Sequence, residues 1–132
     1  MLSNPEYGWC NFELGEFKGS PSYLTDVPVD ILEMCIDYKK KNASICYFDE
    51  EGSDFVLIFA NGEVYIIATR EDSMLYKFPE TTPEALIEEI ILDIERNLDL
   101  WDAEFTIEEN PNEIEKHKLK IIQKLEELKS LK

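Results

Sequence analysis

The sequence predicts an α+β domain, in which an antiparallel sheet of about four or five strands packs against amphipathic helices and a helix closes the chain. β-branched and aromatic runs fill the middle of the chain, an Asn-Gly pair joins two of them, and stretches with helical apolar spacing lie on both sides. The chain has 132 residues, 44% of them hydrophobic and 11% aromatic. Because this is enough for one buried core, we expect residues 1–132 to form a single domain.

The first elements are a strand and a helix. Apolar residues nearly alternate over residues 9–17, which predicts a half-buried strand. A helix is expected next, because Asp26 is a suitable N-cap and Pro28 is tolerated in a first turn. Apolar residues then recur at helical spacing over 31–38, and the lysines at 39–41 suit the carbonyl end of a helix.

The middle of the chain predicts an antiparallel meander. Runs rich in β-branched and aromatic residues occupy 44–48, 55–60 and 64–68, and a fourth strand is expected at 74–78. Asn61-Gly62 separates the second and third runs and is a strong hairpin signal, because both turn positions need positive φ. The links are too short for parallel crossovers, which favours antiparallel order.

Two more helices are expected. The first begins at Thr82, a suitable N-cap followed by proline, and its apolar stripe extends to Leu98. The second begins at Asn110, again followed by proline, and has its own apolar stripe flanked by lysines. Residues 110–132 are therefore predicted to be a C-terminal amphipathic helix, docked on the rest of the domain.

Charge is the strongest compositional signal. The chain carries 29 acidic against 13 basic side chains, a formal net charge of −16. Residues 112–132 hold six lysines and four glutamates, so the other 111 residues carry seven basic and 25 acidic side chains. Such a field attracts cationic partners and repels nucleic acid and anionic membrane surfaces. A basic protein is thus the expected partner, with no binding to nucleic acid or membrane.

The sequence also favours a cytoplasmic location. Residues 1–8 contain neither a basic nor an apolar export signal, and no apolar run approaches the roughly 20 residues of a membrane helix. Cys10, Cys35 and Cys46 are far apart and have neither metal-ligand spacing nor a disulfide framework. We expect them to be reduced and partly buried.

No catalytic motif is recognisable, so the chain is predicted not to be an enzyme and to need no cofactor or metal. Its single histidine, His117, lies between two lysines, and no Gly-rich phosphate loop or HExxH motif occurs. The acidic run 49–54 offers oxygen atoms but lacks the spacing of an EF-hand, so a solvated hairpin turn is expected there. A metal-dependent or carbohydrate-active enzyme is kept as an alternative.

Recognition of a basic partner requires exposed carboxylates close to apolar or aromatic anchors, the combination found in interface hot spots. Trp101 is a possible anchor, although it is also suited to closing the core at a helix end. The candidate partner-binding residues are Asp49, Glu50, Glu51, Asp54, Glu88, Glu95, Asp99 and Trp101.

Three segments carry a family resemblance: WCNFELGEF at 9–17, SYLTDVP at 22–28 and the hairpin at 55–68. With the small size and acidity of the chain, they resemble the immunity proteins of bacterial polymorphic-toxin and contact-dependent growth inhibition systems. The resemblance covers roughly residues 8–106 and is one of overall pattern. It implies an antitoxin that binds and neutralises one cognate toxin, often a nuclease, without doing chemistry. A DNA-mimic regulator, an acidic soluble protein of another role, and self-association through the terminal helix are the alternatives.

Overall fold

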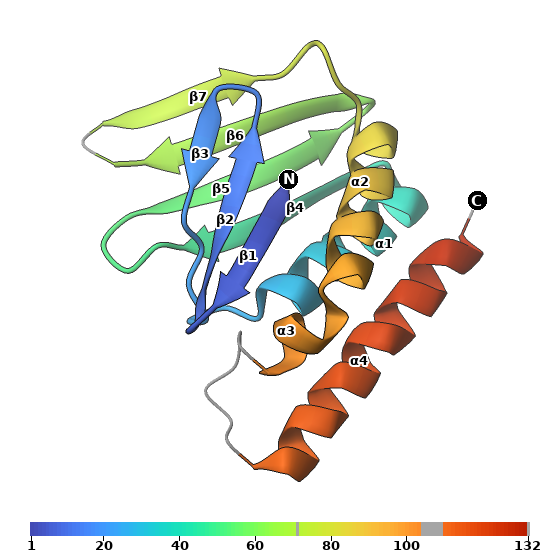
Figure 1. Ribbon diagram of the computed structural model, residues 1–132. Helices are drawn as coiled ribbons and strands as arrows, with labels where there is room; N and C mark the ends of the chain where they lie inside the picture. Colours follow the sequence, from blue (N-terminus) through green and yellow to red (C-terminus); the bar gives the residue numbers. More distant parts are fainter. Residues whose placement is uncertain (71, 104–109, 132) are drawn as a thin grey trace.

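The computed structural model describes residues 1–70, 72–103 and 110–131, which form seven strands and four helices (Figure 1). The predicted α+β class, with antiparallel strands and a C-terminal helix, is confirmed. In chain order the elements are β1 (Leu2–Glu6), β2 (Trp9–Leu14), β3 (Phe17–Gly19), α1 (Val27–Lys41), β4 (Ala43–Asp49), β5 (Asp54–Ala60), β6 (Glu63–Thr69), β7 (Ser73–Lys77), α2 (Pro83–Arg96), α3 (Leu98–Ala103) and α4 (Pro111–Ser130).

The strands are divided between two sheets. One has the order β1-β2-β3 and the other β4-β5-β6-β7, and all neighbouring strands are antiparallel. The strand expected over 9–17 is a hairpin instead, because Gly15 adopts a φ of 56° and turns the chain back as β3. Strand β1 was not predicted. The three-stranded sheet crosses one face of the four-stranded sheet (Figure 1).

An aromatic cluster joins the two sheets. The Phe55 ring of β5 lies 4.9 Å from that of Phe12 in β2 and 5.0 Å from that of Phe17 in β3, measured between ring centroids. It also stacks on Phe48 at 4.7 Å. Phe12, Phe48 and Phe55 have no exposed surface. Phe55 therefore lies at the centre of the packing between the sheets, in an arrangement favoured for aromatic rings.

Helices α1 and α2 begin as the sequence predicts, although only one cap bonds as expected. The hydroxyl of Thr82 accepts a hydrogen bond from the Ala85 amide at 3.2 Å. Asp26 occupies the N-cap position of α1 but makes no side-chain cap bond, because its carboxylate faces His117 of α4, 3.0 Å from Nε2. None of the helices in the described part of the chain is long and apolar enough to cross a membrane.

Helix α4 lies along α1 and α3. It buries Ile121, Leu125 and Leu128 against them, and ion pairs surround this apolar stripe. Four pairs connect lysines and carboxylates across the helix boundary: Lys124–Glu33, Lys40–Glu127, Lys118–Asp99 and Lys129–Glu95. Lysines of the mildly basic terminal helix thus pair with some of the carboxylates on the rest of the chain.

Gly19 of β3 provides a test of the packing between the sheets. A Cβ atom at this position would lie 2.6 Å from Cε1 and 3.0 Å from Cζ of Phe55. Because the Phe55 ring is enclosed by other rings, Gly19→Ala is expected to lower the free energy of unfolding by about 1–3 kcal/mol. Chemical denaturation measures the change. The adjacent exposed Ser20→Ala keeps its backbone bond to Glu50 and should change the value by less than about 0.5 kcal/mol; equal effects would contradict the packing.

Candidate binding surface

The four-stranded sheet has a second face, which points away from the aromatic core. Side chains alternate between the two faces of a strand, and the pairing register places them in rows across the sheet. One row is Ile45–Ile58–Tyr65–Lys77 and the next is Tyr47–Val56–Ile67–Leu75. We call the seven apolar and aromatic side chains of these rows the outer face; they are Ile45, Ile58, Tyr65, Tyr47, Val56, Ile67 and Leu75.

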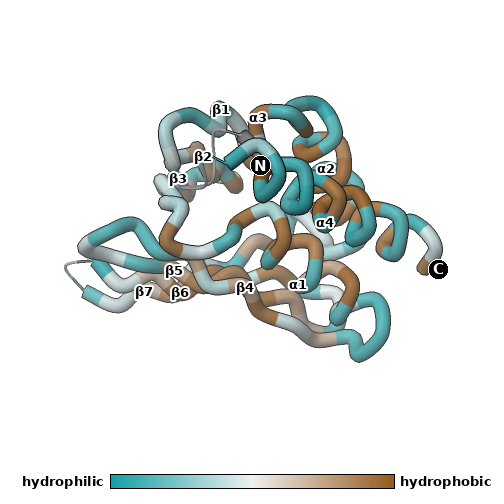
Figure 2. The backbone as a smooth tube through the Cα atoms, turned by 90° about the horizontal axis from the view of Figure 1, so that it is seen from below, coloured by the Kyte–Doolittle hydropathy of each residue, from teal (hydrophilic) through white to brown (hydrophobic). Residues whose placement is uncertain are grey.

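The outer face is open to solvent. Ile45 and Leu75 are 66% and 65% exposed, and Tyr47 and Ile67 are 43% and 41% exposed. Val56, Ile58 and Tyr65 are half-buried between them. Figure 2 shows that the three-stranded sheet lies on one side of the four-stranded sheet; the outer face is on the other side. Neighbouring exposed apolar side chains of this kind make the outer face a candidate interaction site.

Carboxylates border the outer face at both ends of the strands. Asp49 and Asp54 form the row beyond Tyr47 and Val56, and Glu63 lies beyond Tyr65 at the other end. We call these three residues the carboxylate rim. The Tyr47 hydroxyl donates to Asp54 at 3.1 Å, and this bond raises the pKa of Tyr47. The Tyr65 hydroxyl donates to Glu63 in the same way, so both tyrosines connect the apolar band to the rim.

A groove of about 230 Å³ lies between α1 and β4, beside the outer face. Ile45 and Tyr47 form one wall, and three carboxylates spaced along α1, Asp30, Glu33 and Asp37, line the other. Partial desolvation, with Asp26 and Glu33 nearby, raises the pKa of Asp30. The pKa of Glu33 is lowered instead, because Lys124 of α4 bonds to it. The acidic character of the outer face therefore continues past its β4 edge.

The predicted acidic hairpin lies at the end of this face, with one correction. Asp49 and Asp54 belong to the carboxylate rim, and Glu51 is exposed in the turn beside them. The Glu50 carboxylate is engaged within the molecule, because it accepts bonds from the Ser20 amide at 2.8 Å and the Ser53 hydroxyl at 2.9 Å. It also pairs with Arg70 and is only 9% exposed. Glu50 therefore holds the β4–β5 turn against the loop after β3.

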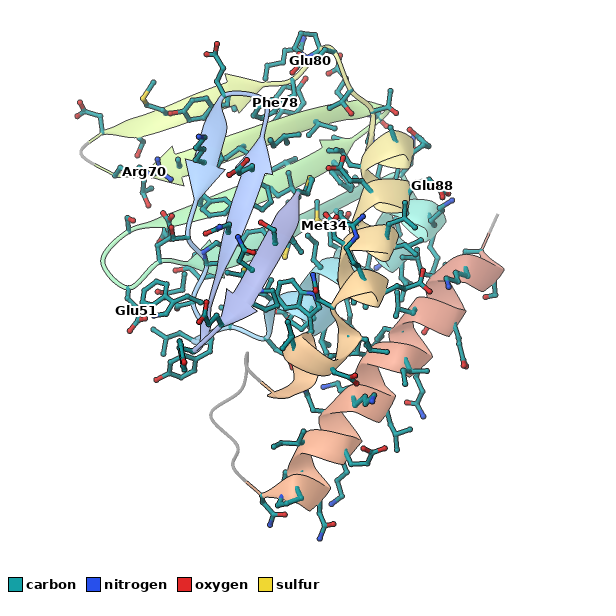
Figure 3. All side chains as sticks on the ribbon, viewed as in Figure 1. Met34, Glu51, Arg70, Phe78, Glu80 and Glu88 are labelled. Atoms are coloured by element: carbon teal, nitrogen blue, oxygen red, sulfur yellow. The ribbon has the colours of Figure 1, made fainter. Side chains whose placement is uncertain are left out.

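The acidic residues predicted on the second helix lie elsewhere. Glu51 and Glu88 are on opposite sides of the molecule (Figure 3). Glu95 pairs with Lys129 at 2.7 Å and Asp99 with Lys118 at 2.6 Å, so both carboxylates contact α4. Glu88 and Glu95 line a separate groove of about 300 Å³ between α2 and α4. Since lysines also line this groove, it lacks the uniform charge of the rim.

Trp101 cannot serve as an exposed anchor. Its side chain has no exposed surface, and its indole N–H donates to the Asp93 carbonyl at 3.4 Å. Trp101, predicted as a possible partner anchor, is therefore not exposed in the free chain, and its alternative role of closing the core at a helix end agrees with this burial. Asp93 is also buried, and its carboxylate accepts the Leu2 amide at 2.9 Å, which attaches β1 to α2.

The three cysteines are buried. Burial raises the pKa of all three cysteine thiols, to about 12 for Cys35, so the reactive thiolate is scarce at neutral pH. Residues 1–70, 72–103 and 110–131 contain no group of three or more His, Cys, Asp or Glu side chains able to hold a metal ion. His117 of α4 is half-buried and bonds the Asp26 carboxylate at the start of α1 at 3.0 Å.

Sequence reasoning missed the outer face, although a signal for it was present. An antiparallel strand with one face in water normally alternates apolar and polar residues. Residues 55–60 are apolar at every position, and 64–67 are as well. Since the structure buries only Phe55, Leu57 and Phe59 of β5 in the core, the other apolar residues lie on the outer face.

Comparison of the chain with protein-family models, with curated proteins and with solved structures finds no match. The binding surface is therefore argued from the residues of this chain alone.

Adjacent isoleucines of β6 test which face of the sheet is open. Ile66 has no exposed surface, whereas Ile67 is 41% exposed on the outer face. Ile66→Ala should lower the free energy of unfolding by about 2–5 kcal/mol, because it leaves a cavity in the core. Ile67→Ala should lower the free energy of unfolding by less than about 1 kcal/mol, because it removes only cross-strand side-chain contacts. Denaturant titration of both variants checks this, and a similar loss in both would mean that the outer face is covered.

Proposed function

We propose that the chain is an immunity-type binding protein, which neutralises a basic, nuclease-type toxin by binding it on the outer face of the four-stranded sheet. The exposed apolar band with its carboxylate rim carries this proposal. Protein interfaces combine an apolar and aromatic centre with a polar border, and Tyr47, Ile67 and Leu75 supply such a centre here. The sequence resemblance to immunity proteins points to the same kind of partner.

Electrostatics support a cationic partner. The net charge of −16 accelerates the approach of a basic protein, and association rates in such pairs reach about 10⁸–10⁹ M⁻¹s⁻¹ at low salt. A nuclease is a natural target, because the cleft that holds its nucleic acid must be positively charged. The carboxylate rim would then bind the lysines and arginines of that cleft while the apolar band covers the surface beside it.

Binding is favoured over catalysis as the activity of this chain. The cysteines are buried with raised pKa, and two carboxylates of the rim, Asp54 and Glu63, bond to tyrosines and a threonine. A DNA-mimic role receives less support, because two apolar rows separate Asp49 and Asp54 from Glu63. A mimic of duplex phosphates would need a continuous line of charge.

The proposal is tested by co-expression with the toxin domain encoded beside this chain's gene. The wild-type chain should rescue growth, and Ile67→Lys should abolish rescue, because it places a positive charge at the centre of the apolar band. Circular dichroism should show that the variant keeps its fold, since Ile67 lies outside the core. Affinity for the inactivated toxin domain should also fall as salt is added.

Glu115→Gln is the matched control. It changes the net charge by the same amount on an exposed part of α4, so it should rescue growth fully. Full rescue by Ile67→Lys would contradict the outer face as the binding site. Absence of a neighbouring toxin gene, or failure of the wild-type chain to bind its product, would contradict the immunity function.

A further inference from the structure

We propose that the toxin also adds a strand to the free edge of β7, extending the four-stranded sheet next to the outer face. This inference rests on the proposed function and names how the same partner is bound. Strand β7 ends the order β4-β5-β6-β7, and within the described residues it pairs with β6 alone. A free edge strand presents unpaired backbone groups to which an extended segment of another chain can bond.

The register identifies which backbone groups of β7 point outward. The Phe78 amide donates to the Val64 carbonyl at 3.0 Å, so these two residues form a hydrogen-bonded pair. Such pairs alternate along an antiparallel ladder, which makes Tyr76 and Met74 the next residues of β7 that bond to β6. Ser73, Leu75 and Lys77 therefore direct their N–H and C=O groups to the free edge, where a partner strand can use them.

The side chains of β7 give its edge little of the usual protection. Met74 and Leu75 point to opposite faces of the strand and are 53% and 65% exposed. Residues 73–77 contain no proline, and their pairing with β6 has no bulge. Lys77 is the only charged residue of the strand, and its ammonium group lies 3.8 Å from the Glu63 carboxylate. Natural sheets normally blunt such an edge with charge, proline or a bulge.

The opposite edge of the sheet is partly covered. The Asp49 carbonyl of β4 accepts the Ser22 amide at 2.8 Å. Helix α1 also lies beside β4, where the Ser44 hydroxyl bonds the Met34 carbonyl at 2.7 Å. Of the two edges of this sheet, β7 is therefore the more open to an added strand.

Charge favours a segment of the basic toxin over a second copy of this chain. Asp72 and Glu80 are exposed on either side of β7, so an added strand with lysine or arginine near its ends would meet opposite charges. A second copy carries a net charge of −16 itself and would bring like charges together. An apolar residue opposite Leu75 would prolong the row Tyr47–Val56–Ile67–Leu75 by one strand.

Leu75→Pro is the test. Proline removes the N–H that points to the free edge but none of the bonds between β7 and β6, so the fold should tolerate it. Leu75→Ala is the matched control, because it shortens the same side chain and keeps the N–H. We expect Leu75→Pro to weaken binding of the inactivated toxin domain at least tenfold more than Leu75→Ala does, with similar thermal unfolding of both variants.

Amide hydrogen exchange of the wild-type chain gives a second measurement. The Leu75 and Lys77 amides should exchange quickly in the free protein and slowly in the complex. Strand addition would be overturned if both amides still exchange quickly in the toxin complex, or if Leu75→Pro and Leu75→Ala bind the toxin equally well. Either result would leave the proposed function intact. If the wild-type chain does not bind the toxin, both proposals fail together. Dimers of the free chain that disappear in Leu75→Pro would identify a second copy as the occupant and overturn the toxin assignment.

Discussion

Packing between the two sheets is the interaction on which the remaining structure depends. Phe55 contacts Phe12, Phe17 and Phe48, and Gly19 leaves room for its ring. The three-stranded sheet covers one face of the four-stranded sheet. The other face of the four-stranded sheet packs against no part of the core formed by the described residues. The apolar residues of that second face are retained in contact with solvent, where they stabilise the fold little. We propose that they are retained for binding a partner.

The acidic charge of the chain is divided between two tasks. Glu33, Glu95 and Asp99 bond lysines of α4 and so help to hold the terminal helix, whose buried apolar stripe is short. Asp49, Asp54 and Glu63 border the outer face instead. The carboxylates behind the net charge of −16 therefore fall into two groups. Those on the helical side bind lysines of α4, and those around the outer face make that face acidic.

Most helices and strands could be predicted from short sequence motifs. Contacts between elements distant in the sequence could not. Thr82-Pro83 and Asn61-Gly62 fix a helix start and a hairpin through backbone chemistry that depends on adjacent residues only. The two-sheet arrangement depends on Phe55 meeting Phe12, 43 residues away in the sequence, which periodicity does not reveal. The same limit explains Glu50 and Trp101. Glu50, a candidate for the partner surface, instead accepts a bond from the Ser20 amide, 30 residues away in the sequence. Trp101, which suited either an anchor or the core, is buried beside the end of α2.

Isoleucine methyl groups offer the most direct measurement of the central claim, that the outer face binds the partner. Ile45, Ile58 and Ile67 lie on the outer face, whereas Ile87 and Ile91 line the groove between α2 and α4. In a methyl-labelled sample, addition of the inactivated toxin domain should shift the signals of Ile45, Ile58 and Ile67 and leave those of Ile87 and Ile91 in place. Shifts confined to Ile87 and Ile91 would contradict the account and place the partner on the helical side.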